Sequence, residues 1–78
     1  MSLLETILDL IEEVKPGLRP DPDEELIKSG RLDSVEVMSL VMALTGEFDI
    51  EITPLDLKEE NFHTARAIES LVARLQEE

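Results

Sequence analysis

The stretch "GRLDSVEVMSLVMAL", residues 30–44, has a clear helical periodicity and contains an Asp-Ser pair, Asp33-Ser34, at its head. Asp33 is a favourable helix N-cap, and Glu36 three residues later completes a D-x-x-E variant of the capping box. Apolar residues then recur at the spacing of one helix face, namely Val37, Leu40, Val41, Leu44 and Phe48. We therefore predict a helix that begins at Asp33 or Ser34 and ends in a C-cap or a frayed turn near Gly46.

This helix carries more apolar surface than the core of a small domain needs. Met38 and Met42 stand four residues apart on a second face, beside the core stripe and flanked by Val35. A surface helix normally shows a single apolar stripe that is roughly 100° wide or a little more. Two interpretations remain open. The methionines pack under a neighbouring loop, or they meet partners or a buried ligand, for which the flexible Met side chain is well suited.

Helices are also predicted on both sides of this stretch. An S-x-x-E capping box and an apolar stripe predict a helix over residues 2–15, which Pro16-Gly17 ends. Thr64 is a good N-cap for a last helix that reaches about Gln76. The apolar stripe of this last helix consists of Ile68, Leu71, Val72 and Leu75.

Two segments between the helices are predicted to be connections. Residues 16–32 hold three prolines and two glycines and form a long first loop. We expect four apolar side chains to attach this loop to the core: Leu18, Leu26, Ile27 and Leu32. Residues 48–52 alternate apolar and acidic, as a strand would, but no partner strand is present, so we predict an extended connection.

The segment before the last helix is predicted to hold a short helix and a loop. Thr53-Pro54 is a usual helix start and predicts a helix over residues 54–58, anchored by Leu55 and Leu57. Residues 59–64, "EENFHT", are predicted to form a loop that the Phe62 side chain attaches to the core. The chain is therefore expected to be a single all-α domain over residues 1–78. We predict a four-helix bundle with three longer helices, one short helix and a long first loop.

The charge balance restricts the partners. Nineteen acidic residues face seven basic ones, which gives a formal net charge of −12. Nucleic-acid backbones and anionic membranes would repel such a chain, whereas partners with basic docking faces are favoured. The N-terminus lacks the basic region of a signal peptide, and no stretch approaches the ~20 apolar residues of a membrane span. We expect a monomeric cytoplasmic protein that binds no nucleic acid and does not insert into membranes.

The residues available for catalysis and metal binding are few. His63 could pair with Ser34, but nothing supplies an oxyanion hole and the chain is too short to form a walled pocket. We therefore read His63 as a loop residue and the protein as a non-enzyme. The acidic run at residues 21–25 fails the EF-hand pattern, because Leu26 and Leu32 occupy the positions that need Gly and Glu. We expect no dedicated metal site.

Ser34 has two possible roles at the head of its helix. In the first turn its side chain lies beside unpaired backbone N–H groups and the positive end of the helix dipole, where a phosphate would be stabilised. Serine is also a common residue at a helix start for capping reasons alone. The position of Ser34 does not decide between these roles.

The string "LDSVEVMSLVMALTGEFDIEI", residues 32–52, resembles the D-S-[LV] site of acyl carrier proteins and the helix and exit that follow it. The flanking "SGRLDS" and "NFHTARAIESLV" fit as well, so the resemblance covers nearly the whole chain. It implies that a phosphopantetheinyl transferase moves 4′-phosphopantetheine from coenzyme A onto Ser34, and that the thiol of this arm carries an acyl group as a thioester. It also implies that Asp33 helps the transferase to recognise the site and that Val35 and Met38 flank the arm.

The resemblance further implies that partner enzymes dock on the same helix, through Glu36, Met42, Glu47 and Asp49. The main prediction is a fatty or related carboxylic acyl cargo in fatty acid, lipid or secondary-metabolite synthesis, loaded by a ligase and passed to synthases or transferases. Two departures favour an alternative. Ser39 stands where better-known members tend to be acidic, and an "NF-x-T" element resembles stand-alone aminoacyl or D-alanyl carriers. The alternatives are an aminoacyl, D-alanyl or peptidyl cargo, or a small acidic helical adaptor without a prosthetic group.

Overall fold

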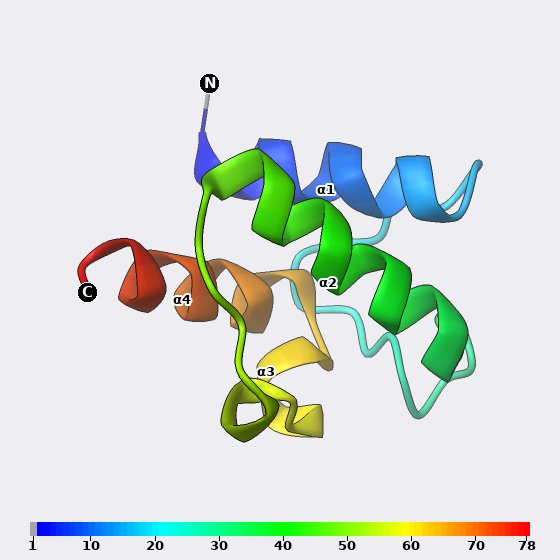
Figure 1. The fold of residues 1–78 in the computed structure, drawn as a ribbon. Coiled ribbons are helices and arrows are strands. Elements are labelled where there is room, and N and C mark those ends of the chain that lie inside the picture. The colour runs from blue at the N-terminus through cyan, green and yellow to red at the C-terminus, as the bar shows by residue number, and fades with distance from the viewer. Residues whose placement is uncertain (1) are drawn as a thin grey trace.

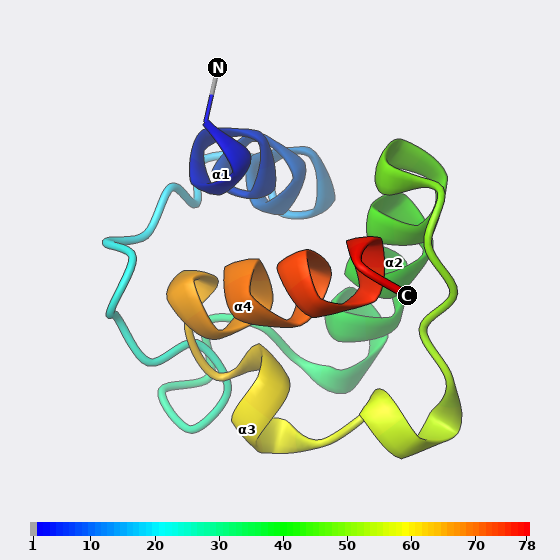
Figure 2. The same cartoon turned by 90° about the vertical axis from the view of Figure 1, so that its left-hand side faces the viewer.

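The computed structural model describes residues 2–78, and all regular structure in that range is helical. Three long helices, α1 (Leu3–Val14), α2 (Ser34–Phe48) and α4 (Ala65–Gln76), are accompanied by a 3-10 turn, η1 (Pro54–Asp56), and a one-turn helix, α3 (Glu59–Phe62). α1 packs against both α2 and α4, and α3 packs against α4 (Figures 1 and 2). The predicted all-α fold with three long helices is confirmed. Within the described residues, no helix is long and apolar enough to cross a membrane.

The core is almost entirely aliphatic: among the described residues Phe62 is the single buried aromatic side chain, and Phe48 packs against the core from its edge. Each long helix contributes the face that its apolar spacing predicts, and both the first loop and the extended segment after α2 add further side chains. The buried residues of this core cluster are Ile7, Leu10, Ile11, Leu26, Leu32, Leu40, Val41, Leu44, Ile50, Phe62, Ala65, Ile68, Leu71 and Val72. Burial of these side chains provides the main driving force for folding, because apolar surface is removed from water.

Side-chain caps set the helix starts, but the end of α2 differs from the prediction. Ser2 and Thr64 each accept a hydrogen bond from the amide three residues ahead, as N-caps do. The helix ends near Gly46, but this residue is not the C-cap, since α2 continues to Phe48 and Asp49 follows it as a left-handed C-cap with φ 52°. Asp tolerates this conformation better than most residues, because its short polar side chain can bond locally.

The segment between α2 and α4 also departs from the prediction. Residues 54–58 form only η1, because the Asp56 carboxylate accepts hydrogen bonds from the amide and hydroxyl of Thr53 at 3.0 and 3.1 Å and closes a tight turn. The predicted loop over residues 59–64 contains α3 instead. Leu55 and Leu57, predicted as anchors, are 81% and 41% exposed. Phe62 is buried as predicted and attaches this segment to the core in their place.

The first loop is attached to the core by apolar contacts and to the start of α4 by backbone hydrogen bonds. Leu26 is fully buried, and its amide donates to the carbonyl of His63 at 2.7 Å. The amide of Arg66 donates to the carbonyl of Pro22 at 3.0 Å, and the amide of Leu32 donates to the carbonyl of Leu26 at 2.9 Å. The prediction that this loop packs on the core is therefore confirmed.

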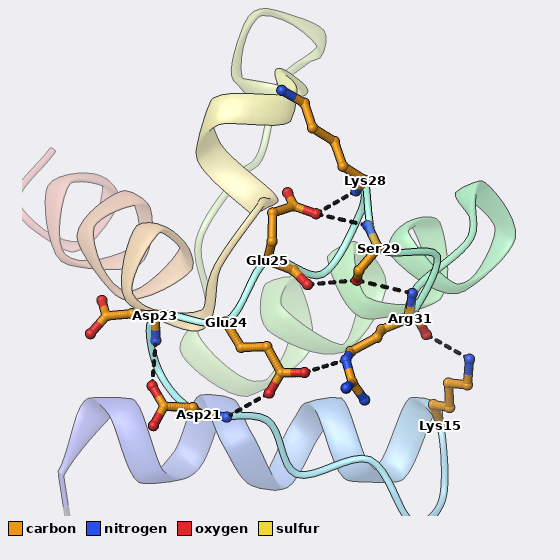
Figure 3. A network of polar contacts seen from close by, with 8 residues as sticks. All are labelled: Lys15, Asp21, Asp23, Glu24, Glu25, Lys28, Ser29 and Arg31. Atoms are coloured by element: carbon orange, nitrogen blue, oxygen red, sulfur yellow. Dashed lines mark hydrogen bonds and ion pairs between the residues drawn. The ribbon is translucent and has the colours of Figure 1, made fainter.

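The acidic run of the first loop satisfies backbone groups of the loop itself (Figure 3). The Glu24 carboxylate accepts from the Asp21 amide at 3.2 Å and forms an ion pair with Arg31. The Glu25 carboxylate accepts from the amides of Lys28 and Ser29. These carboxylates stabilise local turns, which explains how a loop with several prolines and glycines keeps one conformation.

Two arginines join the first loop to the helices. Arg19 donates to Asp9 at 2.8 Å and to Glu12 at 3.2 Å in α1, and Arg66 in α4 donates to Asp23 at 2.8 Å. These hydrogen bonds raise the pKa of both guanidinium groups. Both pairs are exposed, so they position the loop more than they add stability.

We predict that Leu26→Ala lowers the free energy of unfolding by about 2–5 kcal/mol, because it opens a cavity under the first loop. The matched control is Leu55→Ala, which removes the same atoms from a side chain that is 81% exposed and should change the value by less than about 0.5 kcal/mol. Urea denaturation followed by circular dichroism measures both values. Equal losses in the two variants would contradict the described packing of Leu26.

Candidate functional site

Ser34 is the first residue of α2, and its side chain lies at the surface. The capping box predicted before it is complete. The Asp33 carboxylate accepts from the Glu36 amide at 2.8 Å, and the Glu36 carboxylate accepts from the Asp33 amide at 2.9 Å. The first-turn amides of Ser34 and Val35 have no acceptor within residues 2–78, which is the usual state of donors at a helix start. The hydroxyl of Ser34 therefore lies beside two free N–H donors.

Lys15, the C-cap of α1, holds the start of α2 from the other side. Its Nζ donates to the carbonyl of Arg31 at 2.6 Å and lies 3.7 Å from the Glu36 carboxylate. Glu36 thus closes the capping box and meets Lys15 at the same time. The end of α1 and the start of α2 are consequently held together, and the position of Ser34 is fixed from two elements.

A groove of about 300 Å³ lies beside Ser34, between the first loop, the start of α2 and the segment from η1 to α3. Its walls are mostly apolar and consist of Ile27, Leu32, Val37, Met38, Leu57 and Phe62. Four residues bring polar groups to it: Asp33, Ser34, Lys58 and Glu59. The Ser34 hydroxyl therefore lies next to an apolar surface.

The predicted site residues on α2 are spread along the helix, with Met42 near its middle. Val35 and Met38 lie next to Ser34, and Met38 lines the groove. Glu47 and Asp49 lie at the other end of the helix, about 20 Å from Ser34 at 1.5 Å per residue. The structure therefore does not bring all the predicted residues together at one site.

The second apolar face of α2 lies at the surface. Val35, Met38 and Met42 are 73%, 49% and 74% exposed. Met42 therefore does not pack under a loop, whereas Met38 is half exposed and lines the groove together with Ile27 and Leu32 of the first loop. The exposed face is available for contact with another molecule.

Ser34 and His63 lie in different hollows. His63 is the C-cap of α3 and lines a second hollow together with Lys28, Glu59 and Glu60, whereas it does not line the groove beside Ser34. Its Nδ1 atom is buried and has no hydrogen-bond partner within residues 2–78. In that same range, no three His, Asp or Glu side chains are grouped so that they could hold a metal ion.

Lys58 and Glu59 are groove residues that the sequence did not indicate. Both lie more than twenty positions after Ser34, on a segment that was expected to lie at the end of one helix and the start of a loop. Only the tertiary contact of α3 with α4 and the burial of Phe62 carry this segment to the start of α2. No local pattern could have shown that contact.

Comparisons with known proteins place this geometry in context. A family model described as "Phosphopantetheine attachment site" matches residues 2–76. A D-alanyl carrier protein of Lactococcus lactis subsp. lactis is 39% identical over 75 residues, which cover 94% of this chain and 91% of that protein. A D-alanyl carrier protein of Streptococcus suis is 34% identical over 76 residues, or 96% of each chain. One from Staphylococcus xylosus is 29% identical over 77 residues, or 96% of this chain and 99% of that protein.

We predict that Asp33→Ala lowers the free energy of unfolding of the unmodified protein by about 1 kcal/mol, because the Glu36 amide loses its cap. Asp33→Asn keeps a side-chain oxygen acceptor and should cost clearly less. Urea denaturation of the three proteins measures the difference. If the Asn and Ala variants lost the same stability, the hydrogen bond to the Glu36 amide would not be the contribution of Asp33.

Proposed function

Because the match over residues 2–76 shows that this chain belongs to the phosphopantetheine attachment family, we propose that Ser34 carries the prosthetic arm. The family implies a covalently attached 4′-phosphopantetheine, and the chain is a carrier and not an enzyme. One observation carries the assignment to Ser34. Its exposed hydroxyl lies at the positive end of α2, beside two amides without acceptors and at the edge of an apolar groove.

The residues around Ser34 fit the group. In the transfer reaction the Ser34 Oγ bonds to the phosphorus of the pantetheine phosphate, the adenosine bisphosphate half of coenzyme A leaves, and a base of the transferase takes the hydroxyl proton. The amides of Ser34 and Val35 are then placed to donate to phosphate oxygens. The apolar groove suits the branched hydrocarbon part of the arm. When bound, the arm supplies a thiol that holds cargo as a thioester, which a chain without cysteine otherwise lacks.

Asp33 has a structural role in this proposal. Its carboxylate caps the Glu36 amide, so it fixes the first turn of α2 and thereby the direction of the Ser34 side chain. Recognition of Asp33 by the transferase stays a prediction. The carboxylate is exposed and could be contacted by a second protein without leaving its cap, because each carboxylate oxygen has more than one acceptor site.

For the cargo, we propose D-alanine in place of a fatty acyl group. The relatives named D-alanyl carrier proteins favour this alternative, with 27% to 39% identity over nearly the whole chain. A D-alanyl group is small and carries an ammonium, so it gains nothing from an apolar cavity and can stay in water at the end of the arm. A role in fatty acid or lipid synthesis has no comparable support.

The "NF-x-T" element contributes less to this choice than its sequence suggested. Asn61 donates from its side chain to the carbonyl of Asp56 at 2.8 Å, Phe62 fills the core, and Thr64 caps α4. All three residues therefore stabilise the segment from η1 to α4. The element identifies an arrangement of this segment, and the cargo is inferred from the relatives.

We also propose that partner proteins dock on the exposed apolar face of α2. Val35, Met38 and Met42 offer apolar surface near Ser34, and Glu47 and Asp49 add negative charge at the far end. Glu36 contributes less than expected, because its carboxylate already serves the capping box and Lys15. Partners are then the transferase, a ligase that loads the arm and the enzyme that receives the cargo. The cytoplasm, where coenzyme A is available, stays the predicted location.

We predict that incubation with coenzyme A and a broad-range transferase adds the mass of one phosphopantetheine, and that Ser34→Ala adds none. Ser39→Ala, which changes another exposed serine of α2, should be modified like the wild type. A D-alanine-activating ligase with ATP should then load the modified protein, and a fatty acyl ligase should not. Intact mass spectrometry follows each step. An unmodified wild type would overturn the attachment, and preferential loading by the fatty acyl ligase would overturn the cargo.

We predict that Met42→Glu raises the KM of the transferase and of the D-alanine ligase by about ten-fold, because a charge in an apolar contact costs more than about 1 kcal/mol. Ala73→Glu adds the same charge to an exposed position of α4 and should leave both KM values within about two-fold. Unchanged melting temperatures confirm that both variants are folded. A KM that Met42→Glu does not change would place the docking surface elsewhere.

A further inference from the structure

Lys58 differs from the other basic residues of this acidic chain. It is exposed, lies between η1 and α3, and lines the groove beside Ser34. Within residues 2–78, every other lysine or arginine side chain makes an ion pair or a hydrogen bond. The ammonium of Lys58 makes neither, although the chain has a net charge of −12. The local arrangement of the chain, and not a shortage of acidic residues, therefore leaves the Lys58 ammonium without a carboxylate partner.

Two acidic side chains next to Lys58 are engaged with other residues. The Asp56 carboxylate bonds to Thr53, and the Glu59 carboxylate lies 3.9 Å from the Nζ of Lys28. The backbone of Lys58 is held on both sides, since its amide donates to the Asp56 carbonyl and its carbonyl accepts from Asn61, each at 2.9 Å. The structure thus fixes the backbone of Lys58 and leaves its charged end free at the groove.

We propose that Lys58 is a positioning residue whose ammonium pairs with the phosphodiester that joins the prosthetic arm to Ser34. This inference rests on the proposed attachment at Ser34. The phosphodiester adds a negative charge to a chain that already has an excess of them. The amides of Ser34 and Val35 lie at the start of α2, and Lys58 lines the same groove from the segment between η1 and α3. The first part of the arm is then held over the groove and not released into solvent.

Other cations near Ser34 are already engaged. Lys15 bonds to the Arg31 carbonyl and lies close to Glu36, and Arg31 pairs with Glu24. Neither of them lines the groove. A lysine is also suited to this task, because its ammonium is a compact point charge that binds phosphate in several directions. Lys58 is therefore the cation that the groove offers to the arm.

The expected effect is modest and depends on salt. An exposed ion pair changes an equilibrium by roughly two- to five-fold, so loss of Lys58 should lower the ratio of held to released arm by about that factor. Added salt should weaken the pair in the wild type, because it screens exposed charges.

Nuclear magnetic resonance of the lysine side chains tests the inference without any substitution. The chain contains three lysines, Lys15, Lys28 and Lys58, so carbon-13 labelling of lysine gives a simple spectrum. On conversion from the unmodified to the modified protein, the ε-methylene signal of Lys58 should shift, and added sodium chloride should reduce the shift. The signal of Lys28, which does not line this groove and has a 78% exposed side chain, should stay in place.

Phosphorus-31 resonance of the modified protein gives a second measurement. Lys58→Ala should move the phosphodiester signal, Lys58→Arg should keep most of its position, and Lys28→Ala should have no effect. If mass spectrometry shows modification at Ser34 but neither the Lys58 signal nor the phosphorus signal responds, this inference alone is overturned. If Ser34 is not modified, the attachment proposal fails and this inference fails with it.

Discussion

The reciprocal hydrogen bonds between Asp33 and Glu36 set the first residue of α2, and the geometry around Ser34 depends on that start. Ser34 is therefore the first helical residue, and it lies at the edge of the groove. The ammonium of Lys15, at the end of α1, also forms an ion pair with the Glu36 carboxylate. A local cap and one contact between helices therefore place the Ser34 hydroxyl without a rigid surrounding pocket.

The groove and the core share residues, so the site cannot be separated from the fold. Leu32 and Phe62 are buried in the core and also line the groove. Leu32 belongs to the first loop, whose path is set by the burial of Leu26 and by the turns that Glu24 and Glu25 close. The acidic residues of this loop therefore contribute to the position of the site as well as to the negative charge of the chain.

Periodicity and capping predict the three long helices, the fixed first loop and the place of Ser34, because these signals are local and repeat over several turns. They fail between Thr53 and Phe62, where one-turn elements are too short to show a period. One signal was present there, since Asp56 stands three residues after Thr53 as in a capping box. No sequence signal predicted that Lys58 lines the groove, because its position depends on how α3 packs against α4.

The hydrogen bond from the Leu26 amide to the His63 carbonyl joins two segments that are far apart in the chain. Helical turns form early and locally, whereas contacts across such a separation require a large loop to close first. The wall of the groove that contains Phe62 meets the wall that contains Leu32 only after this closure. During folding, α2 and its serine can therefore form before the groove that lies beside them.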